Sequence, residues 1–249
     1  MNTKTLSISF IVGLIILMNI ISISAVCPSG ISGHWKLDEG LGTIASDSIN
    51  SNDGTINNAS WTTDGKVGKA LNFNGVDNYV EIQKDTTLDY GNNSFSVSVW
   101  VKPQSFNGYA QRIIWKNDNI LQPVFTGYYL MTADIGSGDY RFYFGIGDGT
   151  SKVEPTSDVA LIAGNWYYVV GVRDREARKV RLYVNGAEVS NFTDIIQGSI
   201  DYSNGSLIFG AHDIVIEFFN GTIDEVAVFN KALTPMEIQS YYNKSLLGL

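Results

Sequence analysis

Short runs in which apolar and polar residues alternate are the strongest constraint on this chain, and they recur between residues 31 and 229. In residues 95–102 a phenylalanine and three valines occupy every second position, and residues 140–146 and 180–185 repeat the pattern. Side chains of a β-strand point to opposite faces in turn, so each run predicts a strand with one face toward a core. No interior segment keeps a helical period, which favours an all-β fold.

Turn-forming residues separate these runs. Asn185-Gly186 predicts a two-residue hairpin turn, because both central residues of a type I′ turn need a positive φ. The chain of 249 residues holds 25 Gly, 12 Phe, 5 Trp and 13 Tyr, a composition that suits a turn-rich β protein. Further strands are expected in residues 31–37, 67–73, 79–83, 112–116, 128–133, 166–174 and 206–211. Ten or more strands separated by turns predict a two-sheet antiparallel jelly-roll sandwich.

One helix is expected, close to the C-terminus. Thr234-Pro235-Met236-Glu237 combines a capping box with a proline at the first helical position. Ile238, Tyr241 and Tyr242 would then lie on one side of the helix. This pattern predicts a short C-terminal helix that docks against the sandwich. Because no linker or internal repeat interrupts the chain, residues 26–249 are interpreted as one domain.

Residues 1–25 differ from the rest of the chain. One lysine precedes a long run rich in Ile and Leu, as in a secretory signal peptide, and Ile23-Ser24-Ala25 offers a cleavage site. The alternative is an uncleaved anchor, because about 20 apolar residues span a bilayer as a helix. Both interpretations predict an extracellular or cell-surface domain, with a membrane contact only through this segment if it is uncleaved.

The charge balance limits the partners that the domain can have. The chain has 17 basic and 25 acidic residues, for a formal net charge of −8. Nucleic-acid binding depends on clustered Lys and Arg, so this balance argues against it. The single cysteine, Cys27, excludes an intramolecular disulfide and a cysteine-based zinc site.

Several segments, in their order and spacing, resemble the laminin-G-like (concanavalin A-like lectin/glucanase) jelly-roll superfamily. These segments are residues 34–40 (HWKLDEG), 52–55 (NDGT), 70–75 (ALNFNG), 95–102 (FSVSVWVK), 181–186 (RLYVNG) and 221–238, which contains GTIDEV and FNKALTP. The resemblance implies a jelly-roll fold. It leaves the function open, because this superfamily includes lectins, adhesion modules and hydrolases.

A catalytic site is not evident from the sequence. Glycoside hydrolysis normally needs two carboxyl groups that face one glycosidic bond. Glucanases of the superfamily place them in a Glu-x-Asp-x-x-Glu string, and this chain has none. Asp224 and Glu225 are adjacent and would point to opposite faces of a regular strand. His34 and His212 are isolated, so structural or surface roles are expected for both. An atypical acid pair assembled from different strands stays an alternative.

A calcium ion is the one cofactor that the sequence predicts. The loop of residues 47–54 is rich in the Asp, Asn and Gly residues that supply oxygen ligands. It resembles the superfamily segment associated with calcium, which is commonly completed by an aspartate that Asp224 matches. The alternation also slips at Asp224-Glu225, which predicts a β-bulge. The expected ligands are Asp47, Asn52, Asp53 and Asp224, with Asp38 and Asp77 as further candidates. Turn formation alone is the alternative explanation of the loop.

Aromatic residues on polar strand faces and in loops are candidates for ligand binding. The residues selected are Trp100, Tyr109, Trp115, Tyr143 and Tyr183. Core packing is the competing role for each of them, since most of the aromatic residues of a sandwich are structural. The sequence thus predicts a non-catalytic binding or adhesion module for a glycan or an extracellular protein. The alternatives are a glycosidase or polysaccharide lyase, and a surface or filament subunit that assembles with copies of itself.

Overall fold

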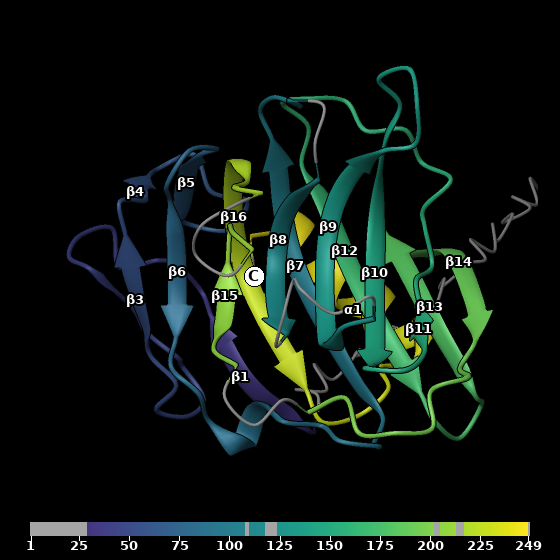
Figure 1. Cartoon of the computed structure of the whole chain (residues 1–249). Helices are drawn as coiled ribbons and strands as arrows, with labels where there is room; N and C mark the ends of the chain where they lie inside the picture. Colours follow the sequence, from purple (N-terminus) through teal and green to yellow (C-terminus); the bar gives the residue numbers. More distant parts are fainter. Residues whose placement is uncertain (1–28, 108–109, 118–123, 202–204, 213–216, 249) are drawn as a thin grey trace, which may run out of the picture.

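The computed structural model describes residues 29–107, 110–117, 124–201, 205–212 and 217–248. Two antiparallel sheets of eight strands face each other, and one helix follows them (Figure 1). The predicted all-β, two-sheet jelly-roll sandwich with a short C-terminal helix is therefore confirmed. The proposed leader, residues 1–25, and Cys27 lie outside the described residues. Within the described part of the chain, no helix has the length and apolar character needed to cross a membrane.

We call the sheet that contains the C-terminal strand sheet A. Its strands run in the order β14-β13-β12-β7-β16-β5-β4, and β1 also pairs with β16. The bounds are β1 Ile31–Trp35, β4 Ser60–Thr62, β5 Ala70–Asn74, β7 Phe95–Pro103, β12 Tyr167–Asp174, β13 Lys179–Val184, β14 Ala187–Thr193 and β16 Asn220–Phe229.

The other sheet, sheet B, has the strand order β11-β10-β9-β8-β15-β6-β3-β2. The bounds are β2 Ile44–Ala45, β3 Gly54–Asn57, β6 Tyr79–Ile82, β8 Gln111–Asn117, β9 Thr126–Asp134, β10 Tyr140–Asp148, β11 Lys152–Val153 and β15 Leu207–Phe209. A 3-10 helix, η1 (Thr86–Leu88), lies on the chain where it crosses from β6 of sheet B to β7 of sheet A.

The core between the sheets comes from the apolar phase of each strand. Phe95, Val97, Val99 and Val101 of β7 are fully buried there with residues of sheet B such as Phe144. The opposite phase of β7 is also buried, contrary to the pattern of a half-exposed strand. A second layer on the outer face of sheet A causes this. The C-terminal helix covers Trp100, and the segment that leads into the helix covers Ser96.

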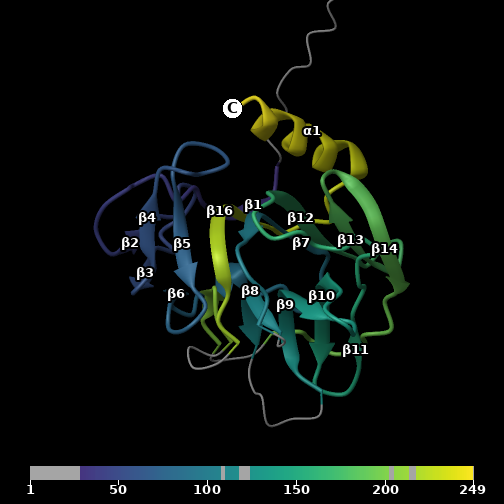
Figure 2. The same ribbon diagram turned by 90° about the horizontal axis from the view of Figure 1, so that it is seen from above.

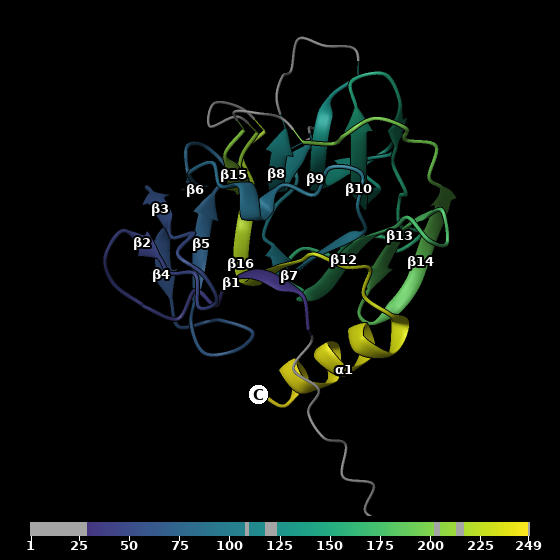
Figure 3. The ribbon, with the colours of Figure 1, turned by 90° about the horizontal axis from the view of Figure 1, so that it is seen from below.

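Helix α1 (Pro235–Leu246) covers the outer face of sheet A, as Figures 2 and 3 show. Thr234 and Glu237 form the predicted capping box at its start. Ile238 is fully buried against a cluster that includes Trp100 and Tyr168. Docking of this helix turns the outer face of sheet A into a second, smaller core.

The predicted hairpin and bulge are both present. Asn185 and Gly186 have φ angles of 51° and 84° between β13 and β14, as a type I′ turn requires. In β16 the register shifts between Asp224 and Ala227, and Glu225 has a φ of 50°. The bulge marks a change of partner, because β16 pairs with β5 up to residue 223 and with β1 from residue 226.

Candidate functional site

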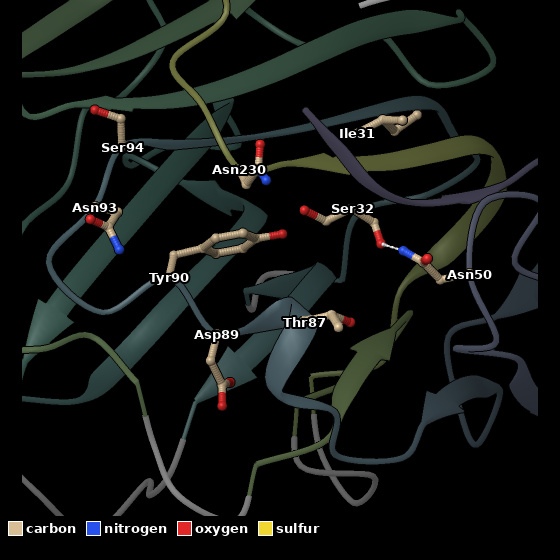
Figure 4. A pocket seen from close by; sticks show the side chains of 9 residues that line it. All are labelled: Ile31, Ser32, Asn50, Thr87, Asp89, Tyr90, Asn93, Ser94 and Asn230. Atoms are coloured by element: carbon tan, nitrogen blue, oxygen red, sulfur yellow. Dashed lines mark hydrogen bonds between the residues drawn. The ribbon is translucent and has the colours of Figure 1, made fainter. Parts of the chain in front are cut away.

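A polar pocket lies at the end of the sandwich where η1 carries the chain from one sheet to the other. Its volume is about 490 Å³, within the range of small-ligand sites. Figure 4 shows the side chains that line it, which come from β1, the β2–β3 loop, the segment from η1 to β7 and the residue after β16. The lining residues are Ile31, Ser32, Asn50, Thr87, Asp89, Tyr90, Asn93, Ser94 and Asn230. We call this cavity the end pocket.

Tyr90 forms the floor of the end pocket. Its ring stacks on Phe95 at a centroid distance of 4.9 Å, which fixes the side chain to the main core. The Tyr90 hydroxyl is buried and has no hydrogen-bond partner. The Ser32 hydroxyl lies beside it but is too poorly placed to form a regular hydrogen bond, so burial raises the pKa of Tyr90 and Ser32 opposes this only in part. A buried hydroxyl without a partner costs free energy, so a ligand that hydrogen-bonds to it would gain affinity.

Exposed amide side chains surround the opening of the pocket. Asn93 and Asn230 are exposed, and neither side chain forms a hydrogen bond to another described residue. Asn50 donates from Nδ2 to the Ser32 carbonyl at 2.7 Å, which leaves its own side-chain oxygen available. Asp89 forms an ion pair with Lys116, with 2.7 Å between Nζ and Oδ1. The end pocket therefore offers several polar groups that a hydroxylated ligand can satisfy.

The loop predicted to bind calcium forms one side of this pocket. Asp47 Oδ1 accepts from the His34 and Ile49 amides at 2.9 and 3.0 Å, and Asp53 Oδ1 accepts from the Asp47 amide at 2.8 Å. Asn52 accepts from the Trp35 indole at its carbonyl and donates from Nδ2 to Thr87 Oγ1. These are the bonds of a turn that Asx residues build, which is the alternative role predicted for the loop.

Asp224, the fourth predicted ligand, lies on the other side of β1. Trp35 of β1 pairs with Val226 of β16 along one edge and bridges to Asp47 along the other. Among the residues that the structure describes, no three His, Cys, Asp or Glu side chains are grouped so that they could hold a metal ion. The two further calcium-ligand candidates form other hydrogen bonds. Asp38 accepts from the Lys69 amide, and Asp77 accepts from the side-chain amides of Asn58, Asn74 and Asn78.

Asp224 nevertheless has an unusual environment. Oδ2 accepts from the Lys66 and Val67 amides at 2.7 and 3.0 Å, at the point where β16 changes partner. Oδ1 is buried without a hydrogen-bond partner, and the residue is fully buried. Burial, with a smaller contribution from the Glu225 charge, raises the pKa of Asp224 to about 8, although the amides of Val67, Lys66 and Glu225 oppose the shift. Such a carboxylate is either protonated or neutralised by a cation.

The aromatic residues selected from the sequence do not form one surface. Trp100 and Tyr183 point to the outer face of sheet A, where they are 2% exposed in the cluster beneath α1. Trp115 and Tyr143 belong to a cluster on the outer face of sheet B. Trp100 and Tyr183 therefore lie on a different sheet from Trp115 and Tyr143, and the four cannot contact one ligand together. Tyr109 lies outside the described residues.

The outer face of sheet B is aromatic but capped. The Arg112 guanidinium lies 4.8 Å from the centre of the Trp115 ring and 4.5 Å from that of Tyr129, and Arg112 pairs with Glu217. His212 packs on Trp115 at 3.8 Å between ring centres, as a structural histidine does. Burial, followed by the nearby Arg112 charge, lowers the His212 pKa to about 4. Trp115 is only 4% exposed, so these rings are mostly occupied with each other.

Sequence reasoning missed the residues that define the end pocket. Tyr90, Asn93 and Asn230 lie outside the strands, in connections where polar residues normally form turns. The run Asp89-Tyr90-Gly91-Asn92-Asn93 was the available signal, since it places an aromatic residue inside a polar turn. Only the fold brings this run next to the β2–β3 loop and Asn230.

Comparison with known proteins agrees with this architecture. The model of the concanavalin A-like lectin/glucanases superfamily matches residues 74–239, about two thirds of the chain. None of the curated proteins is significantly similar in sequence.

Solved structures of the same fold include both binding domains and parts of enzymes. The binding domain of Paraclostridial Mosquitocidal Protein 1 aligns with a TM-score of 0.69 at 15% identity over 86% of this chain and 52% of that one. A second match is domain 4 of AbnA, a GH43 extracellular arabinanase from Geobacillus stearothermophilus, whose structure was solved in complex with arabinotriose. It aligns with a TM-score of 0.63 at 23% identity, over 84% of this chain and 97% of that domain. Trypanosoma rangeli sialidase aligns with a TM-score of 0.65 at 16% identity, over 88% of this chain and 33% of the sialidase chain. The chain thus spans about half of the toxin domain and a third of the sialidase.

Proposed function

The chain belongs to the concanavalin A-like lectin/glucanase superfamily, and from this premise we propose that it is an extracellular, non-catalytic module that binds a glycan in the end pocket. The observation that carries the proposal is the unpartnered Tyr90 hydroxyl at the floor of a pocket surrounded by amide side chains. Sugar hydroxyls both donate and accept hydrogen bonds, so they match amides and a phenol. The arabinotriose complex of the arabinanase domain supports a carbohydrate ligand.

The pocket is better suited to binding than to glycosidic cleavage. Asp89 is the one carboxylate among its lining residues, and it is paired with Lys116. Hydrolysis needs a second carboxyl group that faces the same bond. An Asn or Tyr side chain can orient a sugar without supplying that acid and base chemistry. We therefore assign the pocket to recognition.

A glycan array probed with the protein, with and without calcium, tests this proposal, and a reducing-sugar release assay accompanies it. We expect binding without release of sugar. Asn93→Ala and Asn230→Ala should each weaken binding about tenfold, the usual effect of losing one or two hydrogen bonds. Asn191→Ala, on β14 far along sheet A, is the control and should leave binding unchanged. Absence of glycan binding, or release of reducing sugar, would contradict the proposal.

Calcium belongs to this proposal as a structural ion, with Asp224 as its main ligand. A cation would satisfy the buried Oδ1 of Asp224, which has no hydrogen-bond partner, and carbonyls and water would have to supply its other ligands, because no three His, Cys, Asp or Glu side chains of the described residues are grouped around it. Asp47 also has a buried oxygen without a partner, Oδ2, and it remains the second candidate. A bound calcium ion would supply positive charge that keeps the Asp224 carboxylate ionised.

Calcium titration of thermal unfolding tests the ion. We expect calcium to raise the Tm of the wild-type protein and to have no effect on Asp224→Ala. Asp158→Ala changes an exposed aspartate that is not a candidate ligand and is the control, so it should keep the wild-type response. An equal calcium shift in the wild type and Asp224→Ala would refute the assignment.

A further inference from the structure

A second cavity lies on the opposite side of sheet A from the core, beneath the end of α1. It has a volume of about 440 Å³ and is lined by residues of β1, β7, β12, β16 and α1 together with the β2–β3 loop and Val67. Figures 2 and 3 show the C-terminal end of α1 lying toward β1 on this face. We call it the helix groove. Ile31 is the one residue that lines both this groove and the end pocket.

The floor of the helix groove is apolar and rigid. Trp100, Tyr168 and Phe229 are nearly fully buried in the layer that α1 covers. The Trp100 ring stacks on Tyr242 at 5.7 Å, and its indole N–H donates to Ser245 Oγ at 2.9 Å. These contacts fix the floor before any ligand arrives. A preorganised floor reduces the entropy that binding would otherwise lose.

The bulge in β16 brings a hydrogen-bonded histidine–glutamate pair into this groove. Glu225 has a positive φ, a conformation that costs free energy for any residue except glycine. Its side chain meets His34 of β1, with 2.6 Å between Oε2 and Nε2, while Asp224 bonds to the amides of the β4–β5 connection. Both partners of the pair are partly exposed, at 20% and 18% of their side chains. The groove therefore has a fixed hydrogen-bonding pair at its wall.

The remaining charges of the groove are basic, although the chain as a whole is acidic. Lys36 and Lys244 line the groove, and neither ammonium group forms an ion pair or hydrogen bond with another described residue. Lys66 lies beside it, with Nζ 4.5 Å from the centre of the Trp100 ring. Glu225 is the one acidic residue among the lining residues, and its carboxylate is already hydrogen-bonded to His34. Two unpaired ammonium groups over an apolar floor complement an amphipathic anion.

We propose that the helix groove binds the carboxylate-bearing sugar of an acidic glycan, as a site separate from the end pocket. A hexuronic acid has a carboxylate for Lys36 and Lys244, ring C–H groups for the apolar floor, and hydroxyls for His34 and Glu225. The proposal shares with the proposed function the premise that the ligand is a glycan. It differs in the residues used and in the charge of the sugar, so each can fail alone.

Isothermal titration with trigalacturonate and with the uncharged galactose trimer tests this site in the full protein. We expect the acid to bind more tightly than the neutral sugar and its affinity to fall as salt rises. Lys36→Gln and Lys244→Gln should each weaken binding of trigalacturonate about tenfold. Lys152→Gln makes the same charge change on β11 of sheet B and should leave the affinity unchanged.

The end-pocket variant Asn230→Ala separates the two sites, because it should leave the affinity for trigalacturonate unchanged. Equal affinity for the neutral trimer, no detectable binding of trigalacturonate, or an unchanged affinity in both lysine variants would each overturn the proposal. Both lysines are polar surface residues outside the core clusters, so the glutamine variants are expected to fold, and their Tm values check this.

Discussion

Tyr90 in the end pocket and Trp100 beneath α1 are both almost fully buried aromatic residues, yet their polar atoms have opposite surroundings. The Trp100 indole N–H has a partner in Ser245, and its ring contacts Tyr168, Trp166 and Tyr242. The Tyr90 hydroxyl is buried without a partner, and Tyr90 lines a cavity. In the first case the side chain completes the fold. In the second, one polar group is left for a ligand to satisfy.

This difference explains why aromatic composition alone could not identify the site. A sandwich with 30 aromatic residues uses most of them for packing, and a strand position does not reveal which face will be covered later by a helix. The satisfied or unsatisfied state of the polar atom distinguishes the two regions. It also predicts how each region responds to mutation.

Removal of the Trp100 ring should have the largest effect. Trp100→Ala leaves a cavity between sheet A and α1 and should lower the free energy of unfolding by about 3–5 kcal/mol. Urea denaturation measures the loss, with Tyr143→Ala on the outer face of sheet B as the control, since Tyr143 is only partly buried. A loss for Trp100→Ala below that of the control would show that α1 does not form a second core.

The bulge between these regions should make stability depend on pH. The folded-state pKa of Asp224, about 8, is raised above its ordinary value of 3.8, so folding favours the protonated form. The contribution of Asp224 to the free energy of unfolding is fully present below about pH 4 and is lost as the pH rises toward 8. In the presence of a calcium chelator, Asp224→Asn should gain about 4 kcal/mol relative to the wild type between pH 5 and pH 8, because each unit of pKa shift is worth about 1.4 kcal/mol. A constant difference across this range would disprove the shifted pKa.

The hydrogen bond that satisfies Trp100 should have a smaller effect. Ser245→Ala removes the acceptor and leaves a buried indole N–H without a partner, which should cost about 1–2 kcal/mol. Thermal unfolding measures it. Ser206→Ala is a matched control, because its hydroxyl bonds to the partly exposed Glu81. Equal losses in the two variants would argue against a specific role of Ser245.

Tyr90→Phe should have the smallest effect on stability and a clear effect on binding. The change removes a hydroxyl that has no partner in the protein, so the free energy of unfolding should stay within about 0.5 kcal/mol of the wild type. Binding of the strongest ligand found on the glycan array should weaken about tenfold. If binding is unchanged, the end pocket is not the glycan site.

Much of the fold followed from local patterns. The alternation predicted β7, β10, β12 and β13 to within two residues, Asn185-Gly186 predicted the hairpin, and the capping box predicted the start of α1. The phase slip at Asp224-Glu225 predicted the bulge. These features depend on residues close in sequence. The short strands β2, β4 and β11 were missed because they are too brief to show a period.

The candidate site could be predicted only in fragments. The loop of residues 47–54 was singled out for calcium, and it lies at the end pocket, where Asn50 contributes to the lining and Asp47 and Asp53 accept the bonds of a turn. Trp115 and Tyr143 are on the other sheet. The pocket joins segments about 200 residues apart, from Ile31 to Asn230, and no local pattern encodes that contact.

By itself the sequence determined which segments become strands, where the chain turns and where the last helix begins, because side-chain alternation, positive φ and capping act over a few residues. The tertiary structure alone decided which strand faces α1 buries, where β16 exchanges β5 for β1, and which polar atoms remain without a partner. These outcomes depend on the packing of distant segments. The same packing left the Tyr90 hydroxyl without a partner and the two groove lysines without an ion pair among the residues described.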